Sequence, residues 1–93
     1  MQIHWDEVKN KNLIAERGLS LDTFASLILE NKYYDILKNP SRPEQKIFII
    51  PFQNYTYVVP FVIDKDLNIV IKTVFPSRKY HKMYGEKNER NIG

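Results

Sequence analysis

Two runs rich in Ile, Val, Phe and Tyr, residues 46–52 and 55–63, constrain the fold of this chain most strongly. Residues of these types favour β-strands, and the pair Gln53 and Asn54 between them is short enough for a tight hairpin turn. A third apolar run, residues 69–75, follows a turn at 64–68. Because strands joined by short turns pair antiparallel, we predict an antiparallel meander in which residues 69–75 form a central strand covered on both faces. Prolines cannot donate to a sheet, so Pro51 and Pro60 are expected at an edge, a bulge or a strand end.

Helical patterns precede these strands. Asp6 is a suitable N-cap for a helix over residues 7–17, and Gly18 is suited to end it. A second helix is predicted from Ser20 to Asn31 or Lys32. The first helix is expected to turn four residues inward: Trp5, Val8, Ala15 and Leu19. The second carries a clearer stripe at helical spacing: Leu21, Phe24, Ala25, Ile28 and Leu29.

The predicted fold class is α+β, with the two N-terminal helices packed on one face of the sheet. Ser77 can cap a short last helix that ends near Tyr84. At 93 residues the chain fits one domain, which we place at residues 1–85. The remaining residues, 86–93, are expected to be a flexible polar tail.

Composition excludes several classes of protein. The chain has no cysteine, which rules out disulfides, thiolate metal sites and a cysteine nucleophile. The histidines, His4 and His81, are too far apart in sequence for a metal-ligand pattern, and the three glycines are isolated, so phosphate-binding loops are absent. No apolar run approaches the length of a membrane span, and the N-terminus does not resemble a signal peptide. We therefore expect a cytoplasmic protein without a membrane association, a metal or a small-molecule cofactor.

The positive charge is concentrated at the C-terminal end. Residues 1–71 contain eight Lys and Arg against nine Asp and Glu, whereas residues 72–93 contain six against two. Such asymmetry suggests a polyanionic partner, although a solvated lysine-rich tail would produce the same count.

The basic segment after the last apolar run could bind and cleave RNA. On a helix that begins near Ser77, Arg78, His81 and Lys82 share a face. RNA supplies its own nucleophile, the 2′-hydroxyl, so the protein needs only a proton carrier and cations. We assign His81 as acid or base and Arg78 and Lys72 as electrostatic clamps. A further set is expected to guide the RNA: Ser77, Lys79, Lys82 and Lys9. The alternative is a surface helix with an incidental histidine.

The chain also resembles the BrnT toxins, RelE-like ribonuclease toxins of bacterial type II toxin–antitoxin modules. At the C-terminal end, residues 72–79 (KTVFPSRK) are similar to the family's I-I-S-A-R-R-A-T segment. The family usually has Lys-His before the glycine, where this chain has Glu16 and Arg17, and it has small or hydroxyl residues where this chain has Tyr80 and His81. The N-terminal similarity consists of Trp5, Asp6, Glu7, Lys9, Asn10, Asn12 and Gly18.

The resemblance implies helices on an antiparallel sheet, RNA such as messenger RNA as substrate, and a BrnA-like antitoxin with a DNA-binding ribbon-helix-helix part. Our leading hypothesis is therefore a metal-independent endoribonuclease toxin. The alternatives are a non-catalytic module that uses the same basic edge to bind nucleic acid or protein, and a small structural subunit.

Overall fold

The computed structural model describes residues 1–86, which form helices packed on a mixed six-stranded sheet. The strand order is β1-β5-β4-β3-β2, and the short β6 pairs with β4 beside this path. The elements are β1 (Ile3–His4), α1 (Glu7–Arg17), α2 (Leu21–Leu29), β2 (Asp35–Lys38), β3 (Lys46–Phe52), β4 (Tyr55–Ile63), β5 (Ile69–Ile71), β6 (Phe75–Pro76), α3 (Arg78–Tyr80) and the π-helical turn η1 (His81–Gly85). The α+β class is confirmed. The expected tail at 86–93 lies, except for Glu86, outside the described residues.

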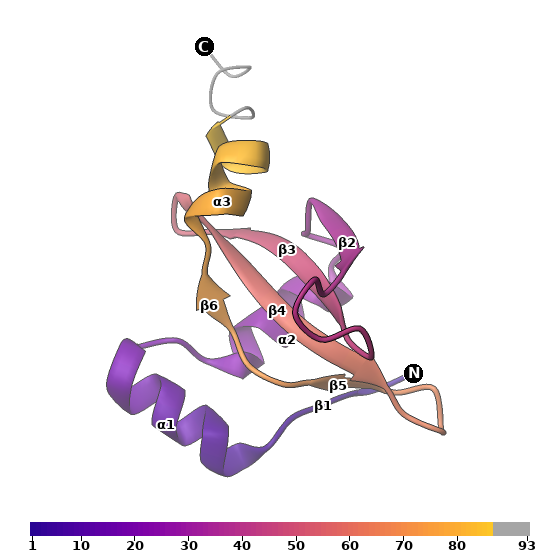
Figure 1. The fold of residues 1–93 in the computed structure, drawn as a ribbon. Coiled ribbons are helices and arrows are strands. Elements are labelled where there is room, and N and C mark those ends of the chain that lie inside the picture. The colour runs from indigo at the N-terminus through magenta and orange to yellow at the C-terminus, as the bar shows by residue number, and fades with distance from the viewer. Residues whose placement is uncertain (87–93) are drawn as a thin grey trace.

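The β3–β4 hairpin is the centre of the sheet (Figure 1). Gln53 and Asn54 connect the strands with φ values of 50° and 62°, the left-handed pair that a two-residue hairpin turn requires. The meander β3-β4-β5 is antiparallel, as predicted, and β2 adds a further antiparallel strand beside β3. The expectation of a purely antiparallel sheet is wrong, because β1 joins β5 in parallel.

The last strand is interrupted beside Pro60. The carbonyl of Pro60 accepts a hydrogen bond from the backbone N–H of Lys72 (2.8 Å). Because the N–H and C=O of one strand residue point to the same side, the proline nitrogen, which carries no hydrogen, also faces this segment. The chain therefore leaves β4 after β5 and pairs with it again only at β6. The predicted central strand at 69–75 is wrong: it is two short strands, and β4 is central. The register shifts by one residue across this gap, so that residues 72–74 lie opposite Val59 and Pro60. Pro60 therefore sits at a bulge, as expected, although it is buried.

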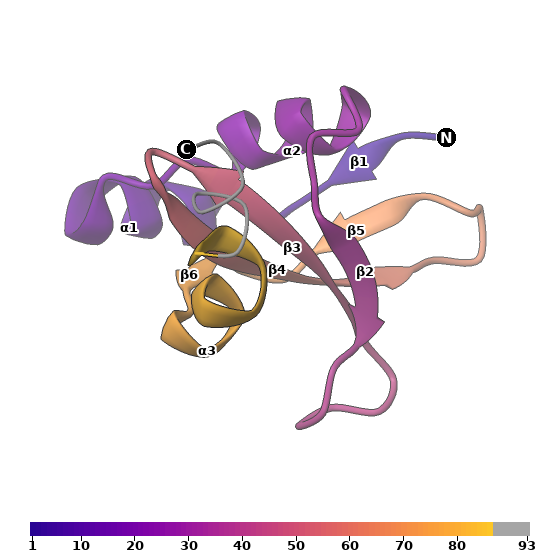
Figure 2. The ribbon, with the colours of Figure 1, turned by 90° about the horizontal axis from the view of Figure 1, so that it is seen from above.

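The sheet has a core on each face. Helix α2 lies on one side of the sheet and α3 on the other, while α1 lies at the edge of the sheet next to β6 (Figure 2). The first core joins α2 to β3, β4 and β5 through a set of buried apolar residues that includes Leu21, Phe24, Phe48, Val59 and Ile71. A smaller core on the opposite face, which we call the second face, consists of Ile47, Ile49 and Val58 under Tyr34, Leu37, Tyr80 and Tyr84.

Polar contacts, together with the packing of Leu13 on the first core, hold α1 in place. The Asp6 side chain caps α1 by accepting from the N–H groups of Val8 and Lys9, and Gly18 ends the helix at φ 66°. Asn10 is buried, and its side chain accepts from the N–H of Leu21 (2.7 Å) and donates to Asp22 (2.9 Å) at the start of α2. The predicted inward positions of Val8 and Ala15 are wrong, because both are exposed.

Helix α2 ends at Leu29, two residues before the earlier of its two predicted ends, and Leu29 is 64% exposed rather than part of the stripe. The predicted α-helix at 78–84 is only partly correct, since it widens into a π-helical turn from His81. Among the described residues, no helix combines the length and hydrophobicity needed to cross a membrane.

Candidate nucleic-acid interface

A cleft of about 420 Å³ opens on the second face of the sheet. Pro60 contributes to its floor, two residues along β4 from Val58 and therefore on the same face. Its walls come from α1, the loop at 39–45 and the segment after β5. The lining residues are Lys9, Asn39, Ser41, Arg42, Gln45, Pro60, Lys72, Thr73 and Phe75.

Three cations and no carboxylate line this cleft. We call Lys9, Arg42 and Lys72 the cleft cations. Among residues 1–86 the structure has one ion pair, between Lys32 and Glu30 (3.6 Å), so no described carboxylate neutralises the cleft cations directly. Since uncompensated charges of one sign in a hollow focus the electrostatic potential, the cleft is suited to an anion.

A second hollow of about 360 Å³ extends the basic surface along α1. It shares Lys9, Thr73 and Phe75 with the cleft and adds Arg17, together with the single carboxylate of Glu16. The segment at 73–75 thus runs between two hollows that carry more positive than negative groups.

Hydrogen bonds within the loop at 39–45 hold Arg42 over the cleft. The backbone N–H of Asn39 donates to the carbonyl of Gln45 (3.1 Å), and the Asn39 amide donates to the Gln45 side chain (3.2 Å). The N–H of Gln45 donates to the carbonyl of Arg42 (2.9 Å), and that of Ser41 donates to the Asn39 side chain (3.0 Å). These contacts close the loop, so the Arg42 backbone is held before any ligand arrives.

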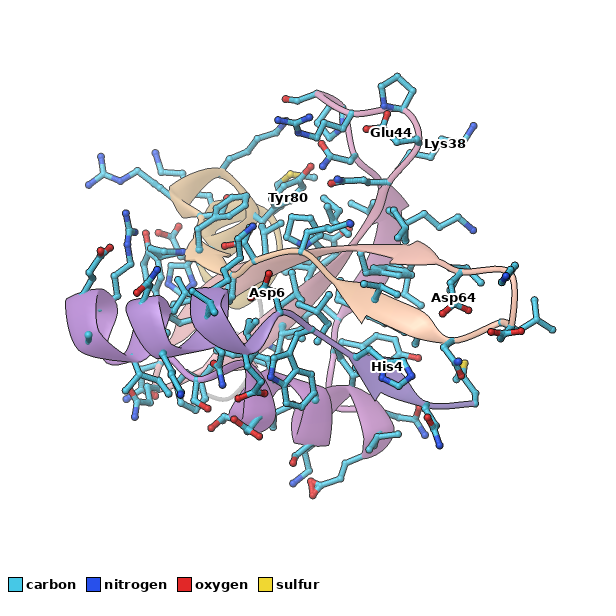
Figure 3. All side chains as sticks on the ribbon, turned by 90° about the horizontal axis from the view of Figure 1, so that it is seen from below. His4, Asp6, Lys38, Glu44, Asp64 and Tyr80 are labelled. Atoms are coloured by element: carbon cyan, nitrogen blue, oxygen red, sulfur yellow. The ribbon has the colours of Figure 1, made fainter. Side chains whose placement is uncertain are left out.

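A second group of cations projects from the C-terminal helix. Arg78, Lys79 and Lys82, which we call the helix cations, are exposed. Ser77 precedes them, and its hydroxyl accepts from the N–H of Tyr80 (3.2 Å), which confirms the predicted cap. Tyr80 packs on the second face and lies at the base of this helix in Figure 3.

His81 faces the sheet rather than the helix cations. Its Nδ1 is 2.9 Å from the hydroxyl of the buried Thr56, and its ring packs on Tyr55 with the centroids 4.3 Å apart. Gly85 leaves the room for this arrangement, since a Cβ there would come within 3 Å of the imidazole and 2.8 Å from the Thr56 hydroxyl. The half-buried ring is therefore oriented from two sides.

The predicted site residues do not form one cluster. The N–H of Lys72 bonds to Pro60, and the N–H of Ser77 bonds to Thr56. These acceptors are four residues apart on β4, which separates the two backbone positions by about 13 Å. Lys72 therefore lies with Lys9 in the cleft, while Arg78 and His81 lie beyond it on the C-terminal helix. That Arg78, His81 and Lys72 act together on one phosphate stays a prediction; the structure places Arg78 and His81 on the C-terminal helix and the backbone of Lys72 about 13 Å from that of Ser77 along β4.

The sequence does not identify Arg42, which is exposed and lines the cleft, as a site residue. Nothing local indicates that its loop folds back over the sheet; the asparagine and glutamine at its two ends are the nearest signal. His4, by contrast, lies on β1, at the end of the sheet away from the C-terminal helix (Figures 1 and 3). The described chain contains no group of three or more His, Asp or Glu residues positioned to bind a metal ion.

A tyrosine–aspartate contact anchors the C-terminal helix. The Tyr84 hydroxyl donates to Asp35 on β2 (3.0 Å), and its ring stacks on Tyr34 at a centroid distance of 5.7 Å. Burial raises the pKa of Tyr84 above its usual value, and the hydrogen bond and negative charge of Asp35 raise it further. The helix cations thus sit on a segment pinned to the edge strand.

Neither the protein-family models nor the curated proteins contain a match. Among solved structures, the crystal structure of the Brucella abortus ribonuclease toxin BrnT is similar, with 24% sequence identity and a TM-score of 0.61. The match covers 83% of this chain and 96% of that toxin. The resemblance noted in the sequence is confirmed in three dimensions: the chain has the BrnT fold.

Proposed function

We propose that this protein is the ribonuclease toxin of a type II toxin–antitoxin module and that it cleaves RNA, with messenger RNA as the expected substrate. Its likeness to a ribonuclease toxin in fold supports the proposal. The observation that carries it is the pairing of that fold with cleft and helix cations on the second face. Such a surface suits a flexible polyanion.

The proposed chemistry uses the substrate's own nucleophile. The 2′-oxygen of the RNA attacks the adjacent phosphorus, and the bond from phosphorus to the 5′-oxygen breaks. A base accepts the 2′-hydroxyl proton, and an acid returns a proton to the departing 5′-oxygen. The products are a 2′,3′-cyclic phosphate and a 5′-hydroxyl. This reaction does not require a metal, because cations of the protein can stabilise the crowded phosphorane.

We assign the chemical step to the start of the C-terminal helix. Arg78 would offer two N–H donors to the phosphorane, and His81 would carry the proton on Nε2 while Thr56 holds Nδ1. Lys72 would act from the cleft on the neighbouring phosphate, since about 13 Å separates its backbone from that of Ser77. Lys79, Lys82, Lys9 and Ser77 would guide the chain of phosphates.

Cleavage of purified RNA in EDTA tests this assignment. We expect wild-type protein to cut and an Arg78→Ala variant to cut about 100-fold more slowly, the usual cost of losing one transition-state donor. The control is Lys65→Ala, which removes an exposed cation from the β4–β5 turn. Equal rates for folded wild-type and Arg78→Ala proteins would remove Arg78 from the mechanism.

The role of His81 is tested by its pH profile. If the imidazole transfers the proton, His81→Gln changes the shape of the profile of rate against pH, because the group that carries the proton is lost. If His81 only supports packing on Thr56 and Tyr55, the variant lowers stability and leaves the shape of the profile unchanged.

The contacts of His81 also favour a second candidate function. Its ring is engaged by Thr56 and Tyr55, as in a packing residue, and a module that only binds RNA would need no proton carrier. Such a module would bind RNA with a steep salt dependence and leave it intact, whereas the toxin would convert it to products.

The proposal includes a partner and a location. An acidic or amphipathic segment of a BrnA-like antitoxin, with a ribbon-helix-helix DNA-binding part, would cover the second face in the cytoplasm. We expect expression of this protein to arrest growth and coexpression of a short neighbouring reading frame to restore it. Growth that continues normally while folded protein accumulates would contradict the toxin assignment.

A further inference from the structure

We propose that the cleft beneath the loop at 39–45 is a nucleotide subsite. It would hold one RNA phosphate among Lys9, Arg42 and Lys72 and stack the attached base on Phe75. The biological role of this subsite rests on the proposed ribonuclease function. The subsite adds to that proposal the position at which the protein binds the RNA chain. The binding itself needs only the cleft.

The dimensions of the cleft fit this ligand. Its volume of about 420 Å³ lies in the range of small-molecule sites, which runs from about 300 to 1,000 Å³. Its three cations come from distant parts of the chain and meet without a carboxylate in the lining. An arginine with two lysines suits a phosphate, because the guanidinium binds two oxygens in a fixed geometry and each ammonium supplies a point charge.

Phe75 makes the cleft better suited to a nucleotide than to an anion without a base. It is 41% exposed although it is a large apolar residue, and it lines both hollows. Its backbone is held by pairing with Val58 on β4. Exposed aromatic rings beside cations are the usual platform for bases of single-stranded nucleic acids. The Thr73 hydroxyl and Gln45 amide in the same lining offer polar contacts to sugar or base.

The arrangement is formed before binding. Four hydrogen bonds close the loop that carries Arg42, and Asn10 locks α1, which carries Lys9, to the start of α2. Lys72 is fixed through its backbone bond to Pro60. Little ordering of the backbone is then needed when RNA enters, which favours affinity.

Binding of a fluorescent 2′-O-methyl RNA oligonucleotide tests the subsite without cleavage, because its nucleophile is blocked. Fluorescence anisotropy in EDTA should show about tenfold weaker binding for Arg42→Gln, with the salt slope reduced by about one. Phe75→Leu should weaken binding about tenfold with an unchanged slope, because it removes stacking rather than charge. Lys65→Gln, the matched surface control, should bind as wild type does.

Amide NMR shifts locate the contact. Uridine 3′-monophosphate should shift residues 39–45 and 72–75, whereas inorganic phosphate should shift those around Arg42 and Lys72 and leave Phe75 in place. Shifts confined to residues 77–82, with wild-type affinity in Arg42→Gln, would overturn the subsite. Identical shifts with phosphate and nucleotide would overturn the role of Phe75.

Failure of the subsite and failure of the proposed function are distinguishable. If wild-type protein cleaves RNA but Arg42→Gln binds and cleaves normally, the subsite is wrong and the ribonuclease function stands. If the oligonucleotide binds through Arg42 and Phe75 but unmodified RNA stays intact, the subsite stands and the ribonuclease function is wrong.

Discussion

Replacing Asn10 with alanine tests the claim that one buried amide joins the two N-terminal helices. The change removes the acceptor of the Leu21 N–H and the donor to Asp22. The Leu21 N–H, left buried without an acceptor, costs about 1 to 3 kcal/mol. The lost hydrogen bond to the Asp22 carboxylate adds a similar or smaller amount, because Asp22 is exposed. Alanine has a better helix propensity than asparagine, which offsets about 0.5 kcal/mol of this loss in stability. We expect a net loss of about 2 to 3 kcal/mol.

Thermal unfolding followed by the fluorescence of Trp5 measures this loss. Trp5 is the only tryptophan and packs against the core between the sheet and α2. For a domain of this size the expected loss lowers Tm by about 10 to 20 °C. The matched control is Asn12→Ala, an exposed asparagine in the same helix, which should shift Tm by only a few degrees.

The difference in Tm between these two variants tests whether the hydrogen bonds of Asn10 hold the helix pair together. If Asn10→Ala unfolds within a few degrees of Asn12→Ala, the buried hydrogen bonds of Asn10 do not hold the helix pair. Asn10→Asp separates the two contacts, because it keeps an acceptor for Leu21 and places two carboxylates together. That variant should be less stable at neutral pH than in mild acid, where one carboxylate is protonated.

Two further predictions concern the C-terminal helix. Gly85→Ala should displace the imidazole of His81 from Thr56 and cost about 1 to 3 kcal/mol, because its Cβ would crowd both side chains; an unchanged chemical shift of the His81 ring in NMR would contradict this packing. Tyr84→Phe should cost about 1 kcal/mol at neutral pH by removing the bond to Asp35. The pKa of Tyr84 is raised in the folded state, so the stability that its proton provides is complete below the unfolded pKa of about 10 and is lost as the pH rises through the folded value. Urea unfolding between neutral pH and about pH 11 should therefore show a smaller alkaline loss for Tyr84→Phe than for wild type, and equal losses would contradict the contribution of Tyr84.

Much of the fold could be predicted because its signals are local. The hairpin at 46–52 and 55–63 and the helix at 7–17 have the predicted bounds. Their causes lie within a few residues: β-branched runs around Gln53 and Asn54, and a cap at Asp6 with a glycine at 18. The N-terminal residues that resemble the BrnT pattern include Asp6, Asn10 and Gly18, each of which has a structural task here.

The errors have non-local causes. Val8 and Ala15 were expected inside because helical spacing cannot show that α1 is held by the buried amide of Asn10. The run at 69–75 was expected to form one strand because its interruption depends on Pro60 in a neighbouring strand. The sequence could not show that the His81 ring contacts Thr56 or that Gly85 leaves room for this contact, because Thr56 lies on β4, 25 residues earlier in the chain.

The sequence by itself determined which segments become strands and helices, that positive charge gathers toward the C-terminus, and that Lys9 and Lys72 were candidates for RNA contact. Only the tertiary structure decided that these two lysines share a cleft with Arg42 and Phe75, and that His81 does not join them. The physical reason is the distance along the chain over which each interaction acts. Propensities and caps act over a few residues of chain, whereas the meeting of charges at residues 9, 42 and 72 depends on strand register, a closed loop and a helix position.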